Sequence, residues 1–286
     1  MIETIEVDEN GNCNEEGTYM MPGLQGISGS EVKVAFMNPA GSMTGQLFPT
    51  GNPCDYITVS ATEARGESLS VRATLLDVAN PFVLVDSSTL PADFQDPNCD
   101  DPAYLPLVES IRREGAVRMG LADSIASAAQ VRGTPKIAFL WPPASSDGKS
   151  DIMVRAFSMG KPHPSLQLTG AVCLGAGVCL PGTVPYRLAD QTIGARFLPT
   201  PERTPSPSGK ANGEDVTKDV VGKELEVQTP SYDVAQAVRI EHASGLMEVE
   251  VVTRQSSGRS GAVDVERCVV SRTARRLFEG NVYFYL

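Results

Sequence analysis

The segment 165–180 constrains the fold of this chain more than any other segment. Its central part, from Gly170 to Val178, reads Gly-Ala-Val-Cys-Leu-Gly-Ala-Gly-Val, so every position is small or apolar. A helix that is apolar on all sides has no face suited to water and must be buried. Because the side chains are small, strands can approach it closely on every side. The pattern predicts a buried helix enclosed by sheet, in which Cys173 and Cys179 are packing residues.

The rest of the chain is dominated by short alternating or apolar runs, which are typical of strands. Helical spacing is indicated from about residue 102 to 120, where a glycine ends the pattern, and again at 151–159, where Asp151 begins the run. Many strands without β-α-β alternation indicate the α+β class. We expect strands at residues 2–7, 32–36, 69–76, 81–86, 136–140, 237–242, 246–253, 264–270 and 282–285.

Charge and motif content exclude several classes of function. The 24 basic and 35 acidic side chains give a net charge of −11, which argues against nucleic acid as a partner. The longest apolar run, 171–180, is far shorter than the ~20 residues that span a membrane. With only His163 and His242, no H-E-x-x-H motif and no cofactor-binding glycine motif, neither a metal nor a cofactor is expected. We expect His242 to lie at a strand end or turn.

The six cysteines are scattered without a C-x-x-C pair, which favours a reducing, cytoplasmic setting over a disulfide scaffold. The segment 187–235 differs from the rest of the chain, because its middle is rich in Pro, Ser, Gly and charged residues. Such a composition predicts a mobile insertion rather than a packed element.

Three segments are candidate anion-binding sites. In 48–53, Phe-Pro-Thr-Gly-Asn-Pro, the glycine and prolines favour a tight turn, which either cradles an anion with its N–H groups or is an ordinary turn. Arg118, near the expected end of the first helix, either caps that helix or binds a carboxylate. The segment 158–163, Ser-Met-Gly-Lys-Pro-His, lies directly before the buried helix, whose first N–H groups favour a carboxylate.

Eight short segments, taken in order, resemble the PrpF family, which includes 2-methylaconitate cis–trans isomerase and 4-oxalomesaconate tautomerase. Among them are Phe-Pro-Thr-Gly-Asn and Arg-Ala-Phe-Ser-Met-Gly-Lys, and together they cover nearly the whole chain outside 187–235. One departure is Pro162-His163-Pro164, where the family commonly has Leu-His-His. The eight segments are residues 36–41, 48–52, 111–121, 135–139, 155–161, 180–183, 243–245 and 271–275.

The resemblance implies a diaminopimelate-epimerase-like fold, in which each of two lobes is a mixed sheet wrapped round a central helix and the active site lies in the cleft. Residues 165–180 would be the central helix of a carboxy-terminal lobe at 61–272, which includes the insertion. Residues 1–60 would be a remnant of the amino-terminal lobe, with the 48–53 loop, and 273–286 a closing segment returning to it. We therefore expect one lobe with a partial second lobe.

The chemistry implied by the resemblance is cofactor-free proton transfer across the C=C bond of an unsaturated di- or tricarboxylic acid such as aconitate or methylaconitate. The family's catalytic Lys and Cys come from amino-terminal motifs that are not found here, and Cys13 is not a substitute because a charged Glu-Glu-Gly turn follows. The catalytic residues are therefore left unassigned. The implied substrate-binding residues are Thr50, Gly51, Asn52, Arg118, Met119, Ser158, Met159, Gly160, Lys161 and His163.

Two functions stay open. The chain is either an isomerase of a small polycarboxylate, in a form that lacks the Lys and Cys half, or a non-catalytic relative that binds a carboxylate or a partner chain. A homodimer, or a partner that supplies the missing lobe, is expected because an uncovered half-cleft would expose apolar surface.

Overall fold

The computed structural model describes residues 1–5, 7, 9, 17–20, 28–60, 68–99, 101–144, 148–189, 234–255 and 263–274. Within these residues one mixed sheet of twelve strands accompanies a small number of helices. The strands are β1 (Ile2–Ile5), β2 (Tyr19–Met20), β3 (Ser28–Met37), β4 (Asp55–Val59), β5 (Leu69–Val78), β6 (Asn80–Asp86), β7 (Lys136–Trp141), β8 (Ile152–Ser158), β9 (Lys161–Pro162), β10 (Val234–His242), β11 (Gly245–Gln255) and β12 (Val263–Ala274). The helices are α1 (Leu105–Arg118), α2 (Ile125–Gln130), α3 (Leu168–Cys179) and α4 (Val184–Leu188), with short 3-10 turns η1 (Ser87–Thr89), η2 (Ala92–Phe94) and η3 (Pro102–Tyr104).

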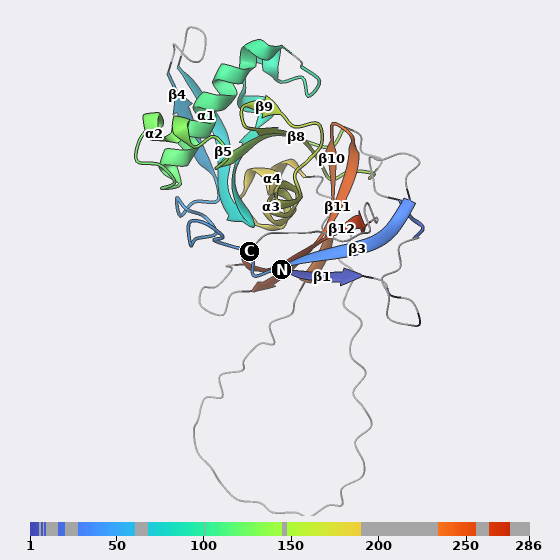
Figure 1. Cartoon of the computed structure of the whole chain (residues 1–286). Coiled ribbons are helices and arrows are strands. Elements are labelled where there is room, and N and C mark those ends of the chain that lie inside the picture. The colour runs from blue at the N-terminus through green and yellow to red at the C-terminus, as the bar shows by residue number, and fades with distance from the viewer. Residues whose placement is uncertain are drawn as a thin grey trace, which may run out of the picture.

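The sheet curls around α3, which is seen end-on in its centre (Figure 1). The strand order is β1-β3-β12-β11-β10-β8-β7-β6-β5-β4, with β2 paired to β3 and β9 paired to β8. Neighbours are antiparallel except for β6 with β7 and β8 with β10. The order brings β10, late in the chain, beside β8 from its middle. Together with the pairing of β12 and β3, this long-range pairing joins distant parts of the chain in one sheet around the helix.

The buried helix predicted at 165–180 is confirmed as α3. All residues from Gly170 to Val178 are buried, and the helix packs against β5, β6, β10, β11 and β12. The sheet approaches so closely that a Cβ on Gly175 would lie 3.1 Å from two atoms of the Val249 side chain. The absence of side-chain bulk at such positions lets strands surround the helix, so the α+β fold with a central helix is the observed one.

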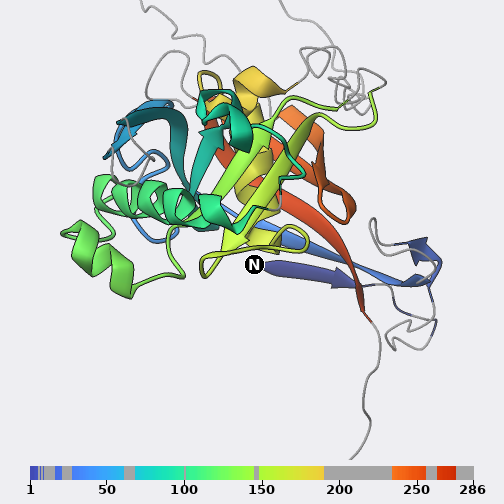
Figure 2. The same cartoon turned by 90° about the horizontal axis from the view of Figure 1, so that it is seen from above.

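A second apolar core lies on the outer face of the sheet and is covered by α1 (Figure 2). Leu107, Val108 and Ile111 of α1 are buried there, as the helical spacing predicts. The helix ends at Arg118, and Gly120 follows with a φ of 70°, a left-handed conformation that glycine adopts without strain. The glycine stop predicted for this helix is confirmed.

The helix predicted at 151–159 is wrong, because these residues form strand β8. The inward-facing Ile152, Val154 and Ala156 belong to the core around α3, while Phe157 faces the outer core. Asp151 does not cap a helix: its carboxylate accepts a hydrogen bond from the Arg239 N–H at 2.7 Å. Burial between two neighbouring strands overrides the helical propensity of Met, Arg and Ala in this segment.

The strands expected between residues 2 and 270 are all found, with small shifts of their ends. Residues 282–285 and most of the expected insertion lie outside the described residues. One continuous sheet joins β3 and β4 to the strands that follow them, and the division at 60 and 272 stays a prediction. Among the described helices, none has the length and apolar character needed to cross a membrane.

Candidate functional site

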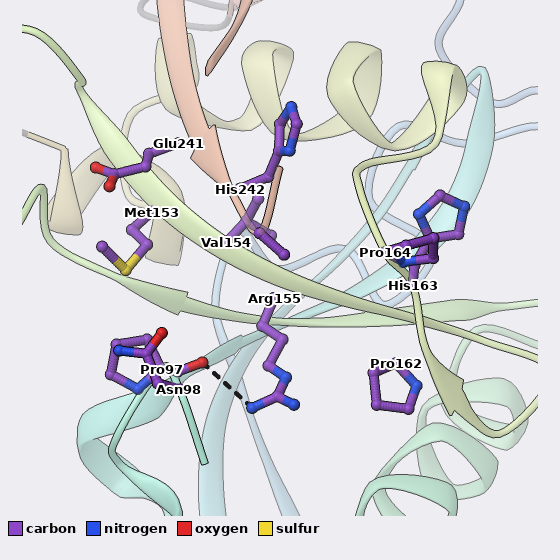
Figure 3. Close-up of a pocket in the computed structure, with 11 residues that line it drawn as sticks. Pro97, Asn98, Met153, Val154, Arg155, Pro162, His163, Pro164, Glu241 and His242 are labelled. Atoms are coloured by element: carbon purple, nitrogen blue, oxygen red, sulfur yellow. Dashed lines mark hydrogen bonds between the residues drawn. The ribbon is translucent and has the colours of Figure 1, made fainter. Parts of the chain in front are cut away.

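A pocket of about 480 Å³ opens where β8 and β10 meet the segment that leads into α3 (Figure 3). Strand β8 supplies its floor, the end of β10 one wall, and the loop before η3 the other. The parallel pairing of Glu241 with Met153 sets the two strands side by side at this point. The pocket is lined by Pro97, Asn98, Met153, Val154, Arg155, Pro162, His163, Pro164, Glu241, His242 and Ala243.

Both histidines of the chain line this pocket, although they lie 79 positions apart in the sequence. His163 is held by its own N–H, which donates to the Ala156 carbonyl of β8 at 2.8 Å. The Ser244 hydroxyl donates to the Pro164 carbonyl and so ties the β10–β11 turn to the segment before α3. The fold therefore brings the two imidazole side chains of the chain to one pocket.

Hydrogen bonds orient both imidazole rings in the same way. The Ser165 N–H donates to His163 Nδ1 at 3.1 Å, and the Ser244 N–H donates to His242 Nδ1 at 3.2 Å. With Nδ1 used as an acceptor, a neutral ring carries its proton on Nε2. The His242 side chain is only 7% exposed, and its Nε2 has no hydrogen-bond partner among the described residues. Burial lowers the pKa of His242, and the nearby Arg272 and His163 lower it further.

The charged residues at the outer side of the pocket have partners in the protein itself. Arg155 donates to the carbonyls of Pro97 and Cys99, and its guanidinium lies 5.4 Å from the centroid of the Tyr104 ring. Glu241 accepts a hydrogen bond from the Ser150 hydroxyl at 3.0 Å. Figure 3 shows the Arg155 side chain and the His242 ring pointing in opposite directions. Arg155 therefore fixes the loop that forms one wall.

The predicted segment 158–163 forms a tight hairpin between β8 and β9. Ser158 pairs with Lys161, and the two residues between them, Met159 and Gly160, have φ values of 53° and 75°. Two successive left-handed residues are typical of a type I′ turn, which favours Asn and Gly. Met159 is 58% exposed, so packing does not explain its place there. Strain of this kind is often found at functional sites.

The pairing of β7 with β8 places Lys136, the first residue of β7, near this hairpin. It pairs with Phe82 on β6, and its Nζ lies 6.0 Å from the centroid of the Phe82 ring. Because β7 and β8 are antiparallel, the pairing of Ile137 with Phe157 puts Lys136, one residue earlier on β7, opposite Ser158, one residue later on β8. Lys136 is not among the site residues predicted from the sequence. A charged residue at the start of an otherwise apolar central strand was the available signal.

The 48–53 loop does not line the pocket, and its polar side chains bind a carboxylate of the chain itself. The Thr50 hydroxyl donates to Asp55 at 2.6 Å, and the Asn52 amide donates to the other Asp55 oxygen at 3.2 Å. The Gly51 N–H donates to the Phe48 carbonyl at 2.9 Å. This loop has the turn that its sequence predicts, while an external ligand for it stays a prediction.

Arg118 and Met119 also lie away from the pocket lining. Arg118 is exposed at the last residue of α1, whereas Met119 is 4% exposed and packs in the outer core. Of the ten predicted site residues, His163 lines the pocket, and Ser158, Met159, Gly160 and Lys161 form the hairpin just before it. Within the described part of the chain, no group of three or more His, Cys, Asp or Glu side chains is placed to hold a metal ion.

Comparisons with known proteins agree with the fold. The family model described as PrpF protein matches residues 1–197 and 222–285. The chain is 31% identical to a 2-methyl-aconitate isomerase of Shewanella oneidensis, over 96% of this chain and 60% of that protein. It is 26% identical to a 3-methylitaconate isomerase of Eubacterium barkeri, over 98% of this chain and 62% of that protein.

The crystal structure of a methylitaconate-delta-isomerase superposes with a TM-score of 0.64, at 23% identity over 98% of this chain and 62% of that one. A structural similarity at this level of identity supports the fold. The chain spans about 60% of the length of the curated relatives named above.

Proposed function

Because this chain belongs to the PrpF family, we propose that it is an isomerase of small unsaturated di- or tricarboxylic acids that acts without a cofactor. Relatives named as isomerases of 2-methyl-aconitate and 3-methylitaconate, and as a 4-oxalomesaconate tautomerase, support this reaction class. In such a reaction a proton leaves the carbon next to the carboxylate-activated double bond, the double bond shifts, and a proton returns at its other end.

The observation that carries the proposal is the joining of both histidines in one pocket beside the start of α3. Proton transfer at neutral pH needs side chains that exchange protons there, and carboxylate substrates need donors that stabilise the charge of the dienolate. His163 suits the second role, because its Nδ1 is occupied by the Ser165 N–H and Nε2 is the donor left for a ligand. The residues that remove and return the proton are left unassigned.

The hairpin residues Ser158 to Lys161 are proposed to bind a second carboxylate. The hairpin begins two residues after Ala156, whose carbonyl accepts the hydrogen bond from the His163 N–H. Lys161 supplies a positive charge in a chain of net charge −11. The loop residues Thr50, Gly51 and Asn52 and the helix-end pair Arg118 and Met119 remain proposed substrate contacts on the family resemblance alone.

A cytoplasmic location, supported by cysteines without a C-x-x-C pair, belongs to the same proposal. So does the division into a lobe at 61–272, a partial lobe at 1–60 and a closing segment at 273–286. A homodimer, or a partner that completes the cleft, is also proposed, because an uncovered half-cleft would expose apolar surface.

Deuterium exchange tests the proposed reaction. The chain is incubated with cis-aconitate or 2-methyl-aconitate in deuterium oxide, and deuterium incorporation and isomer formation are followed by NMR. We expect both to occur, and to be lost in His163→Gln but retained in Lys33→Met, which changes an exposed lysine of β3. Binding of the acids without exchange would contradict the isomerase and support the non-catalytic carboxylate-binding alternative.

A further inference from the structure

A row of residues crosses four strands on the inner face of the sheet, the face that packs on α3. Phe82 on β6 pairs with Lys136 on β7, and Ser158 on β8 pairs with Lys161 on β9. The register of β7 with β8 sets Lys136 opposite Ser158. The inner face is identified by the buried neighbours of this row, Leu84 and Ala138, which belong to the core around α3.

The row lies next to the first turn of α3. A Cβ on Gly170 would be 2.9 Å from the Phe82 ring, and the same point lies 3.1 Å from Gln167 Oε1. The Phe82 ring therefore has Lys136 Nζ on one side and the start of α3 within contact. The first N–H groups of a helix lack internal partners and attract negative charge.

Lys136 is half-buried in this position, and no carboxylate among the described residues pairs with it. Its Nζ instead lies over the Phe82 ring, 6.0 Å from the ring centroid. Burial lowers the pKa of Lys136, because water is withdrawn from the ammonium group. A half-buried cation without an anionic partner among the described residues is costly to the fold, and an anionic ligand would offset that cost.

Gln167, the residue before α3, also has buried polar atoms without a partner among the described residues. Its side chain makes no capping hydrogen bond, and both its amide nitrogen and its amide oxygen are buried with no partner among the described residues. Each buried polar atom left without a hydrogen bond costs about 1–3 kcal/mol. A donor of this kind beside a half-buried lysine is suited to an anionic ligand rather than to packing.

We infer that Lys136 is a substrate-binding residue, which forms an ion pair with a carboxylate group held between the Ser158 hydroxyl, the Gln167 amide and the first turn of α3. This assignment rests on the proposed function for the class of ligand. It adds a second cation to this row, next to Lys161, which is more exposed than Lys136. The ligand is a compact polycarboxylate, because His163 bonds to β8 only two residues before Ser158.

Calorimetric titration with tricarballylate, a saturated tricarboxylate that cannot isomerise, tests this assignment. We expect Lys136→Met to weaken binding at least tenfold at neutral pH and Lys136→Arg to retain most of it. Lys33→Met, which removes the same charge from an exposed site on β3, should stay within twofold of the wild type. Thermal unfolding of Lys136→Met should show nearly the stability of the wild type, which separates a binding residue from a structural one.

The assignment is overturned if Lys136→Met binds within twofold of the wild type, if it binds weakly only because it is unfolded, or if the wild-type chain does not bind the ligand. Deuterium exchange reports separately on the proposed function. A chain that binds tricarballylate through Lys136 but exchanges no protons would contradict the isomerase and leave the binding residue in place. Deuterium exchange that is unchanged in Lys136→Met would contradict the role of Lys136 in binding and leave the isomerase in place.

Discussion

Two regions of the molecule treat their buried polar groups in opposite ways. Beneath α1, Arg112 is 2% exposed, and two of its nitrogens donate to the Glu109 carboxylate at 2.8 Å each. The remaining donors reach the carbonyls of Ala128, Val131 and Thr134 at 2.8, 3.1 and 3.3 Å. The guanidinium is therefore satisfied on all sides, as a buried charge must be if it serves the fold.

Around the start of α3, several polar groups have no hydrogen-bonding or ionic partner in the part of the chain that the structure describes. Lys136 has no carboxylate, the Gln167 amide makes no hydrogen bond, and His242 Nε2 is buried without an acceptor, all within the described residues. The chain can evidently satisfy a buried cation, since it does so for Arg112. This difference is the basis of our proposal that the groups near α3 bind a ligand.

Arg112→Met should give the largest loss of stability. It leaves Glu109 buried beside one remaining partner, Arg113, and removing one member of a buried ion pair costs about 3–5 kcal/mol. Urea unfolding measures the change. The matched control is Arg113→Met, whose side chain is 31% exposed and which should lose at most about 1 kcal/mol. If Arg112→Met lost no more stability than Arg113→Met, the structural role of Arg112 would be contradicted.

His242 should make stability depend on pH in the acid range. Its folded pKa is lowered from 6.5 by burial, then by Arg272 and His163, so the unfolded chain binds more protons. Stability should therefore fall as pH falls below about 6.5, by at most about 1.4 kcal/mol per pH unit for one proton. His242→Asn, which keeps an acceptor for Ser244, should flatten this slope in urea titrations. An unchanged slope would show that other groups cause it.

Lys136→Met should raise or lower the free energy of unfolding by less than about 1 kcal/mol. This change is far smaller than the loss expected for Arg112→Met. The variant loses a cation–π contact worth about 0.5–1 kcal/mol but removes the cost of a desolvated ammonium. Urea unfolding of both methionine variants in one buffer gives the comparison. Equal losses at the two positions would erase the distinction between the regions.

Met159→Asn should stabilise the chain slightly, by about 0.5 kcal/mol, because Asn tolerates the left-handed conformation that Met159 adopts. Met43→Asn is the control, since Met43 is 57% exposed, similar to the 58% of Met159, and is not among the residues with positive φ. Thermal unfolding is sensitive enough for both. A loss of stability in Met159→Asn would mean that the methionine side chain holds the hairpin.

Sequence patterns predicted the parts of this fold that depend on local composition. The all-apolar run of α3, the helical spacing of α1 and the turn between β10 and β11 are all visible in the chain itself. Strand β8 was missed because its residues favour a helix locally, and only pairing with β7 and β10 holds them extended. Local propensity is overridden where a segment is buried between two strands.

The candidate site was less predictable, for the same physical reason. His163 and Lys161 stand next to the helix in the sequence, so their neighbourhood could be expected. His242 reaches the pocket only through the parallel pairing of Ile240 with Ile152, and Lys136 reaches Ser158 only through the register of β7 with β8. Long-range registers of this kind leave no mark in the spacing of one sequence.

The two imidazoles offer the most direct test of the central claim, that the unsatisfied groups near α3 bind a carboxylate ligand. Since the chain has only His163 and His242, its histidine side-chain NMR spectrum contains two sets of signals, which His163→Gln would assign. During titration with tricarballylate we predict that both sets shift together in the wild type and that Lys136→Met needs at least tenfold more ligand. Signals that stay in place while the ligand binds would contradict the claim.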